Sequence, residues 1–182
     1  DEVERVEEEL KKSDDELRRR MEEVKRALDK DNEDAKRMLD EVKKELEKIL
    51  RKVEKEVKDK ESVDRLRKKL EDIKRELERI LEELSKIHED IKKRLDDLLR
   101  ESEEHSRRLI EEIRDLERRG SDKKEVVERL DKLVKEHHER NKRIVEEAKR
   151  LVEDSREKTR RIAERAKELV RRLKELVDRL SK

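Results

Sequence analysis

The chain has 182 residues, of which 57 are basic and 56 acidic, so its formal net charge is +1. Charged residues make up 62% of the sequence and apolar residues 29%, and there is no aromatic residue, proline or cysteine. The lack of cysteine excludes disulfides and cysteine-based metal sites, and the lack of aromatic residues excludes base-stacking platforms for nucleic acids. Apolar residues never occur in long runs, so we expect no membrane-spanning helix. The first ten residues are mostly charged and lack an apolar stretch, so we also expect no signal peptide.

Apolar residues recur along the first third of the chain in steps of three and four residues. The stripe positions, which include two polar ones, are Val3, Val6, Leu10, Ser13, Leu17, Met21, Val24, Leu28, Asp31, Ala35, Leu39, Val42, Leu46, Ile49 and Val53. The pattern repeats about every 18 residues, or five turns of a helix with about 3.6 residues per turn. A disordered chain would not keep this spacing, so the sequence predicts a helix over about residues 2–58 despite its high charge.

The same spacing predicts two further helices, over about residues 63–119 and 122–181. Ser62 is the expected N-cap of the second helix, and Gly120, the only glycine, is expected just after its end. Asp122 with Glu125 resembles a capping box at the start of the third helix. Both connections are short, so neighbouring helices should be antiparallel. The sequence therefore predicts an all-α fold, a single up-down-up three-helix bundle over residues 1–182. It should be nearly untwisted, because its repeat matches the relaxed helix.

Several stripe positions are polar, and they fall at two levels of the predicted bundle. Facing residues should have numbers that add to about 121 for the first two helices and about 241 for the second and third. The first level then contains Ser13, Ser102, His105, Ser106, His137 and Asn141. The second level contains Asn32, Ser85, His88, Ser155 and Thr159. Buried polar groups need partners, and neutral histidine can both donate and accept. We therefore predict two buried hydrogen-bond networks that fix register and topology.

Other functions for these residues are less favoured by the sequence. No histidine pair is spaced by four residues and no Glu-x-x-His motif occurs, so we expect no metal or cofactor. Serine and histidine should meet in a packed core without a substrate cavity, so we expect no enzyme. Basic residues alternate with acidic ones, so we expect no nucleic-acid partner. A pH response stays open: burial that lowers the pKa of a histidine gives stability that is lost in acid.

The chain resembles de novo designed helical bundles in its regular spacing, its Leu/Ile/Val core, its Glu/Lys/Arg/Asp surface and its minimal connections. Natural spectrin-like repeats would be expected to carry aromatic residues and irregular spacing. The resemblance implies a structural scaffold without natural activity or natural localisation, soluble in the cytoplasm of an expression host. The two polar levels resemble the hydrogen-bond networks that give such designs their specificity. Few apolar residues lie outside the stripes, so we expect a monomer. The alternative is an interaction module, pH-responsive through its histidines, that binds a designed helical partner chain or another copy of itself.

Overall fold

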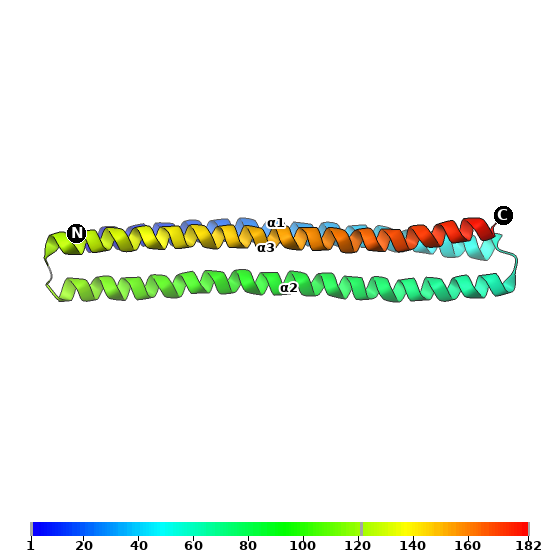
Figure 1. Cartoon of the computed structure of the whole chain (residues 1–182), viewed down its shortest axis with the longest axis horizontal. Helices are drawn as coiled ribbons and strands as arrows, with labels where there is room; N and C mark the ends of the chain where they lie inside the picture. The colour runs from blue at the N-terminus through cyan, green and yellow to red at the C-terminus, as the bar shows by residue number, and fades with distance from the viewer. Residues whose placement is uncertain (1, 121, 182) are drawn as a thin grey trace. The chain divides into compact units, whose positions relative to one another are not determined.

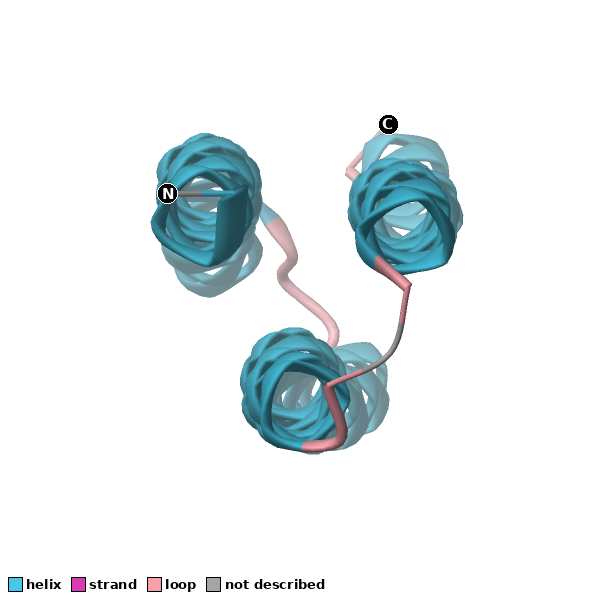
Figure 2. Ribbon diagram, turned by 90° about the vertical axis from the view of Figure 1, so that its left-hand side faces the viewer, coloured by secondary structure: helices cyan, strands magenta, loops and turns pink. Residues whose placement is uncertain are grey.

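The computed structural model describes residues 2–120 and 122–181, and these form three long helices. The helices are α1 (Glu2–Glu56), α2 (Lys60–Arg118) and α3 (Lys123–Leu180), labelled in Figure 1. The described backbone contains helix and connecting loop but no strand (Figure 2), which confirms the predicted all-α three-helix fold. The predicted boundaries lie within one helical turn of the observed ones. Charged residues interrupt every described helix too often for any of them to cross a bilayer.

The chain divides into two compact units, and each unit contains a segment of all three helices. Unit 1 comprises Asp1–Ala27 and Asp90–Glu153, and unit 2 comprises Leu28–Glu89 and Asp154–Lys182. Each unit is therefore a three-helix bundle in itself. The prediction of one domain without supercoil over the whole chain stays a prediction.

The connection between α1 and α2 is shorter than the sequence suggested, and its cap is a different residue. The carbonyl of Asp59 accepts the first backbone hydrogen bond of α2, from the N–H of Val63 at 3.0 Å, so Asp59 is the N-cap. The prediction that Ser62 caps this helix is wrong. Ser62 lies in the first turn, and its hydroxyl donates to Oδ2 of Asp59 at 2.8 Å. This bond fixes the Asp59 side chain at the helix start.

The connection between α2 and α3 contains the one glycine, in the conformation that the sequence predicted. Gly120 has φ +62°, the left-handed conformation in which a side chain is strained. The carbonyl of Asp122 accepts from the N–H of Val126 at 3.0 Å, so Asp122 is the predicted N-cap of α3. Ser121 lies outside the described residues.

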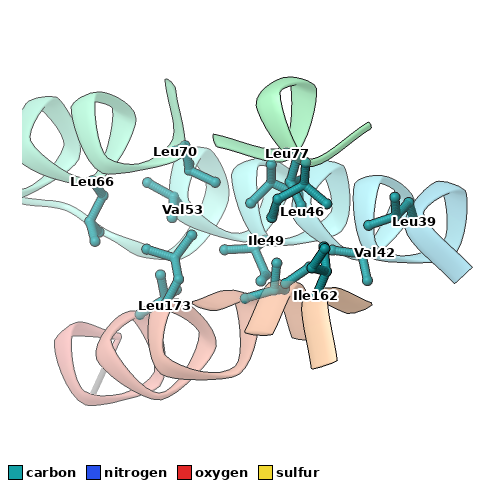
Figure 3. Close-up of a cluster of buried hydrophobic side chains, with 14 of the residues drawn as sticks. Leu39, Val42, Leu46, Ile49, Val53, Leu66, Leu70, Leu77, Ile162 and Leu173 are labelled. Carbon is teal, nitrogen blue, oxygen red and sulfur yellow. The ribbon is translucent and has the colours of Figure 1, made fainter. Parts of the chain in front are cut away.

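The core of unit 2 is a continuous apolar cluster with side chains from all three helices. Figure 3 shows Leu46 and Val53 of α1, Leu70 of α2 and Leu173 of α3 directed toward one another. All four are buried. Burial of each such side chain contributes about 1.5–3 kcal/mol before the entropy of ordering it.

In unit 1 the helices pair as the folded numbering predicted. Arg18 of α1 forms an ion pair with Glu103 of α2, and Lys25 with Asp96, and both sets of residue numbers add to about 121. These pairs confirm that α1 and α2 are antiparallel within this unit. A smaller apolar cluster closes the unit near the start of the chain, formed by Val6, Leu10, Leu109, Ile113, Leu130 and Leu133.

Candidate functional site

A group of polar side chains from all three helices meets in unit 1, next to its apolar cluster. On α1, Asp14 follows the buried Leu10 by four residues; on α3, His137 follows the buried Leu133 by the same step. Residues four apart lie on one helix face, so the stripe that buries the leucines also directs these polar groups inward. We name this group the Asp14 network, and its members are Ser13, Asp14, Ser102, His105, Ser106, His137 and Asn141.

The carboxylate of Asp14 is the acceptor at the centre of the network. Oδ1 lies 2.7 Å from Nε2 of His137 and 3.0 Å from Nδ2 of Asn141, and Oδ2 accepts from the hydroxyl of Ser106. An ionised carboxylate has no proton to give, so Nε2 of His137 carries a proton. The same Nε2 lies 2.9 Å from the hydroxyl oxygen of Ser106, whose own proton points to Asp14. The three donors thus converge on one partly buried acceptor.

Asn141 extends the network toward α1 and α2. Its Nδ2 donates to Asp14 and, at 3.1 Å, to the hydroxyl of Ser13, and its Oδ1 accepts from the hydroxyl of Ser102 at 2.7 Å. The amide of Asn141 therefore uses both of its protons and its oxygen. Nδ2 also lies 3.3 Å from Nε2 of His137, but both nitrogens direct protons at the same carboxylate. That approach is a contact between two donors.

His105 of α2 and His137 of α3 form a pair through their Nδ1 atoms, 2.8 Å apart. The ring planes differ by 17° and the ring centroids are 5.1 Å apart. This separation equals the hydrogen bond plus about one ring radius at each side, so the rings meet edge to edge. One proton lies between the two Nδ1 atoms, because a hydrogen bond needs one donor and one acceptor.

The network keeps Asp14 ionised. Burial opposes ionisation of this carboxyl, but hydrogen bonds from His137, Ser106 and Asn141, with the charge of His137, outweigh it. The pKa of Asp14 is therefore below its ordinary value of 3.8. Asp14 is a carboxylate at neutral pH, as its place as a pure acceptor requires.

His105 is held in its neutral form by its surroundings. Burial lowers the pKa of His105 below its ordinary value of 6.5, and the positive charges of Arg140, His137 and Arg108 add to this effect, while Asp14 opposes it. Nε of Arg140 is buried and, within the described part of the chain, has no hydrogen-bond partner. The network thus has a negative centre at Asp14 and a positive side at Arg140 and Arg108.

At the second predicted level, the polar side chains have other hydrogen-bond partners than the sequence suggested. The ring of His88 bonds to Oδ1 of Asp29 at 2.7 Å, and Nε of Arg156 donates to Asp31 at 2.9 Å. Among the described residues, no side-chain hydrogen bond joins the five residues predicted to meet there, Asn32, Ser85, His88, Ser155 and Thr159. The predicted second network is therefore wrong. The carboxylate of Asp29 on α1, a stronger acceptor than a hydroxyl, takes the place of the partners predicted for His88.

The burial of these five residues differs as well. Ser155 is buried, whereas Asn32, His88 and Thr159 are partly exposed and Ser85 is exposed. Ser85 therefore does not belong to a buried site. His138, next to His137 in sequence, is also exposed, as its position off the apolar stripe implies.

Asp14 is the central residue of the network, and sequence reasoning missed it. Ser13 and Asp14 are adjacent, and each is spaced three or four residues from both Leu10 and Leu17. Either residue therefore fits the stripe by spacing alone. A signal was present: the predicted level held several donors and no charged acceptor, and Asp14 is a carboxylate next to Ser13 that also fits the stripe.

The arrangement differs from catalytic and metal-binding geometries. In a catalytic triad the carboxylate binds Nδ1 of histidine and leaves Nε2 for the nucleophile, but here Asp14 and Ser106 both contact Nε2 of His137. Among the described residues, no group of three or more histidine, aspartate and glutamate side chains is arranged to hold a metal ion. Ser13 and Asn141 line a surface hollow of about 240 Å³, so one edge of the network lies next to solvent.

No protein-family model, curated protein or solved structure matches the chain. The functional interpretation therefore depends on the Asp14 network and on the regular helices that build it.

Proposed function

We propose that this chain is a de novo designed structural scaffold, a monomeric three-helix bundle whose register is specified by the Asp14 network, and that it has no catalytic activity. The observation that carries the proposal is that the acceptor comes from α1, the hydroxyl of Ser106 from α2 and the imidazole of His137 from α3. Such a network closes only when all three helices are in one register.

The physical reason is the cost of unpaired polar groups. Apolar side chains on a regular repeat pack nearly as well after one helix slides by a repeat, so they discriminate poorly between registers. After such a slide, Asp14, His137 and Asn141 would be buried without partners, at about 1–3 kcal/mol for each group. One network is therefore enough to favour a single register, as polar core residues do in coiled coils.

The absence of catalysis in this proposal is supported by the position of the hydroxyl. Ser106 is buried and donates its proton to Asp14, so the proton does not pass to His137. An activated serine would donate to the imidazole instead.

The monomeric state in this proposal is supported by the polar surface. Among the described residues, Leu180 is the one large apolar side chain that is exposed. An interaction module would be expected to show a larger apolar face. Size-exclusion chromatography with light scattering, at about pH 7.5 and about pH 5, tests this point. A mass near 22.4 kDa at both values supports the scaffold, and a larger species that dissociates in acid supports the interaction module.

The register proposal is tested by replacing the network with apolar residues. The variant carries Asp14→Leu, Ser106→Ala, His137→Leu and Asn141→Leu; a control variant in unit 2 carries His88→Leu and Ser155→Ala. Spin labels at the exposed positions Glu8 of α1 and Lys132 of α3 report the distance between these helices, and the sequence has no cysteine to interfere.

We expect the network variant to stay helical and at least as stable, but to give several distances or to associate, while the control variant gives one. A single narrow distance and a monomer in the network variant would show that the apolar core alone sets the register. A network variant that unfolds would show that the network supplies stability rather than specificity, which also contradicts the proposal.

A further inference from the structure

The His105–His137 pair has four ring nitrogens, and the structure constrains three of them. Nε2 of His137 faces the Asp14 carboxylate at 2.7 Å and therefore carries a proton. The two Nδ1 atoms, 2.8 Å apart, share one proton. The remaining nitrogen is Nε2 of His105, on a side chain that is partly exposed. The hydrogen-bond pattern of the pair is thus complete with two protons and leaves one nitrogen open for a third.

We propose that the His105–His137 pair is a two-step proton switch, in which a third ring proton leaves the hydrogen bond between the rings intact and a fourth breaks it and loosens unit 1. The third proton binds Nε2 of His105. The shared proton still lies between the two Nδ1 atoms, whichever ring it is bonded to, so the geometry of the pair does not change. The positive charge of the pair then balances the negative charge of Asp14.

The fourth proton has no place in this geometry. It must bind the Nδ1 that accepts, which would place two N–H groups head to head at 2.8 Å. The rings must then separate, but His137 is fully buried and its other edge is held by Asp14 and Ser106. The pair would also carry two positive charges opposed by the single carboxylate of Asp14. Separation therefore means that α2 moves from α3 in this layer.

The charged groups around the pair influence the pH at which it takes up further protons. From α1 the pair faces Asp14, from α2 Arg108, and from α3 Arg140 with its buried Nε. The two guanidinium groups oppose a further proton on His105, while Asp14 favours it. Burial and these cations lower the pKa of His105, so its neutral form stabilises the fold fully above pH 6.5, and that stability is lost as pH falls toward the folded pKa.

The two units are expected to respond differently. His88, the histidine of unit 2, bonds to the partly exposed carboxylate of Asp29 rather than to a second histidine. A proton added to His88 would strengthen this bond by making it an ion pair. Loosening between about pH 7.5 and pH 4.5 should therefore be confined to unit 1.

The first experiment observes the shared proton directly in the ¹⁵N-labelled protein. We expect a coupling across the hydrogen bond between the two Nδ1 nuclei at about pH 7.5, which persists after one protonation and disappears with the next. The absence of the coupling at neutral pH, or its persistence when both rings are doubly protonated, would overturn the proposal. This measurement needs no variant and so does not depend on one folding.

The second experiment compares backbone amide exchange in the two units over the same pH range, corrected for intrinsic rates. We expect at least a tenfold loss of protection around Ser106 and His137 and less than a threefold loss around Leu46 and Leu70. His105→Gln can donate to Nδ1 of His137 but cannot be protonated, so it should abolish most of the loss in unit 1. His138→Gln, at the exposed neighbour of His137, is the matched control and should show the same loss of protection in unit 1 as the wild type. An equal loss in both units, or an unchanged loss in His105→Gln, would refute the switch.

Discussion

Nε2 of His137 lies 2.7 Å from Oδ1 of Asp14, and the His137 side chain is fully buried while only 14% of the Asp14 side chain is exposed. The pair joins α3 to α1 through a charge that is nearly enclosed. Because Asp14 also accepts from Ser106 and Asn141, loss of its charge would leave several donors facing a poorer acceptor. Removal of one partner from such a site has a large effect on stability.

Asp14→Asn is expected to lower the free energy of unfolding by about 2–3 kcal/mol, because an amide brings two protons to a site that already holds three donors. Urea unfolding near pH 7.5 measures the loss. Asp15→Asn is the matched control, since the Asp15 side chain is 57% exposed and paired only with Arg18 on its own helix in the described contacts, so its change should stay within about 0.5 kcal/mol. Equal effects of the two substitutions would show that Asp14 is not the centre of the network.

The Asp14 carboxylate should also give the chain an acid-dependent stability. Its pKa is below the ordinary value of 3.8 in the folded state, so its contribution is present above pH 3.8 and is lost as pH falls through the folded pKa. The loss has a slope of up to about 1.4 kcal/mol per pH unit. The difference in unfolding free energy between the wild type and Asp14→Asn should therefore shrink below pH 3.8.

A control for this pH profile is Glu168, an exposed carboxylate whose pKa is lowered by its hydrogen bond and ion pair with Arg171. Because solvent screens that ion pair, Glu168→Gln should keep nearly the whole acid dependence of the wild type. If the difference between wild type and Asp14→Asn stayed constant down to pH 2, the carboxylate would not be the titrating group.

Leu95→Ala in the core is expected to lower the unfolding free energy by about 2–5 kcal/mol, because Leu95 is fully buried and its removal leaves a cavity. Leu180→Ala removes the same atoms from a side chain that is 44% exposed, so its effect should be below about 1 kcal/mol. Thermal and urea unfolding of both variants gives the comparison. A small effect at Leu95 would mean that the unit 1 core repacks around the missing atoms.

Asp59→Ala is expected to destabilise the chain by about 1 kcal/mol, because Asp59 is the N-cap of α2. Ser62→Ala removes only the bond from the hydroxyl to the Asp59 carboxylate at an exposed site, so we expect a few tenths of a kcal/mol. Unfolding in urea ranks the two variants. The reverse ranking would restore Ser62 as the principal cap of this helix.

The sequence by itself determined the three helices, their approximate ends and most of the buried positions. These depend on the spacing of apolar residues along one chain segment, and a helix turns by the same angle at every residue. The position of Gly120 was equally local, since its left-handed conformation is a property of the residue. The folded numbering also brought Ser102, Ser106, His137 and Asn141 to one level, because short connections leave little freedom of register.

Only the tertiary structure decided which polar groups bind one another. Ser13 and Asp14 are adjacent on α1 and fit the apolar stripe equally well, and the facing His137 selects Asp14 because a buried donor favours a carboxylate over a hydroxyl. In the same way His88 bonds to Asp29 instead of to the partners predicted for it. Spacing along a helix places a side chain on a face, but the choice between neighbours on that face is made by the donors and acceptors of the other two helices.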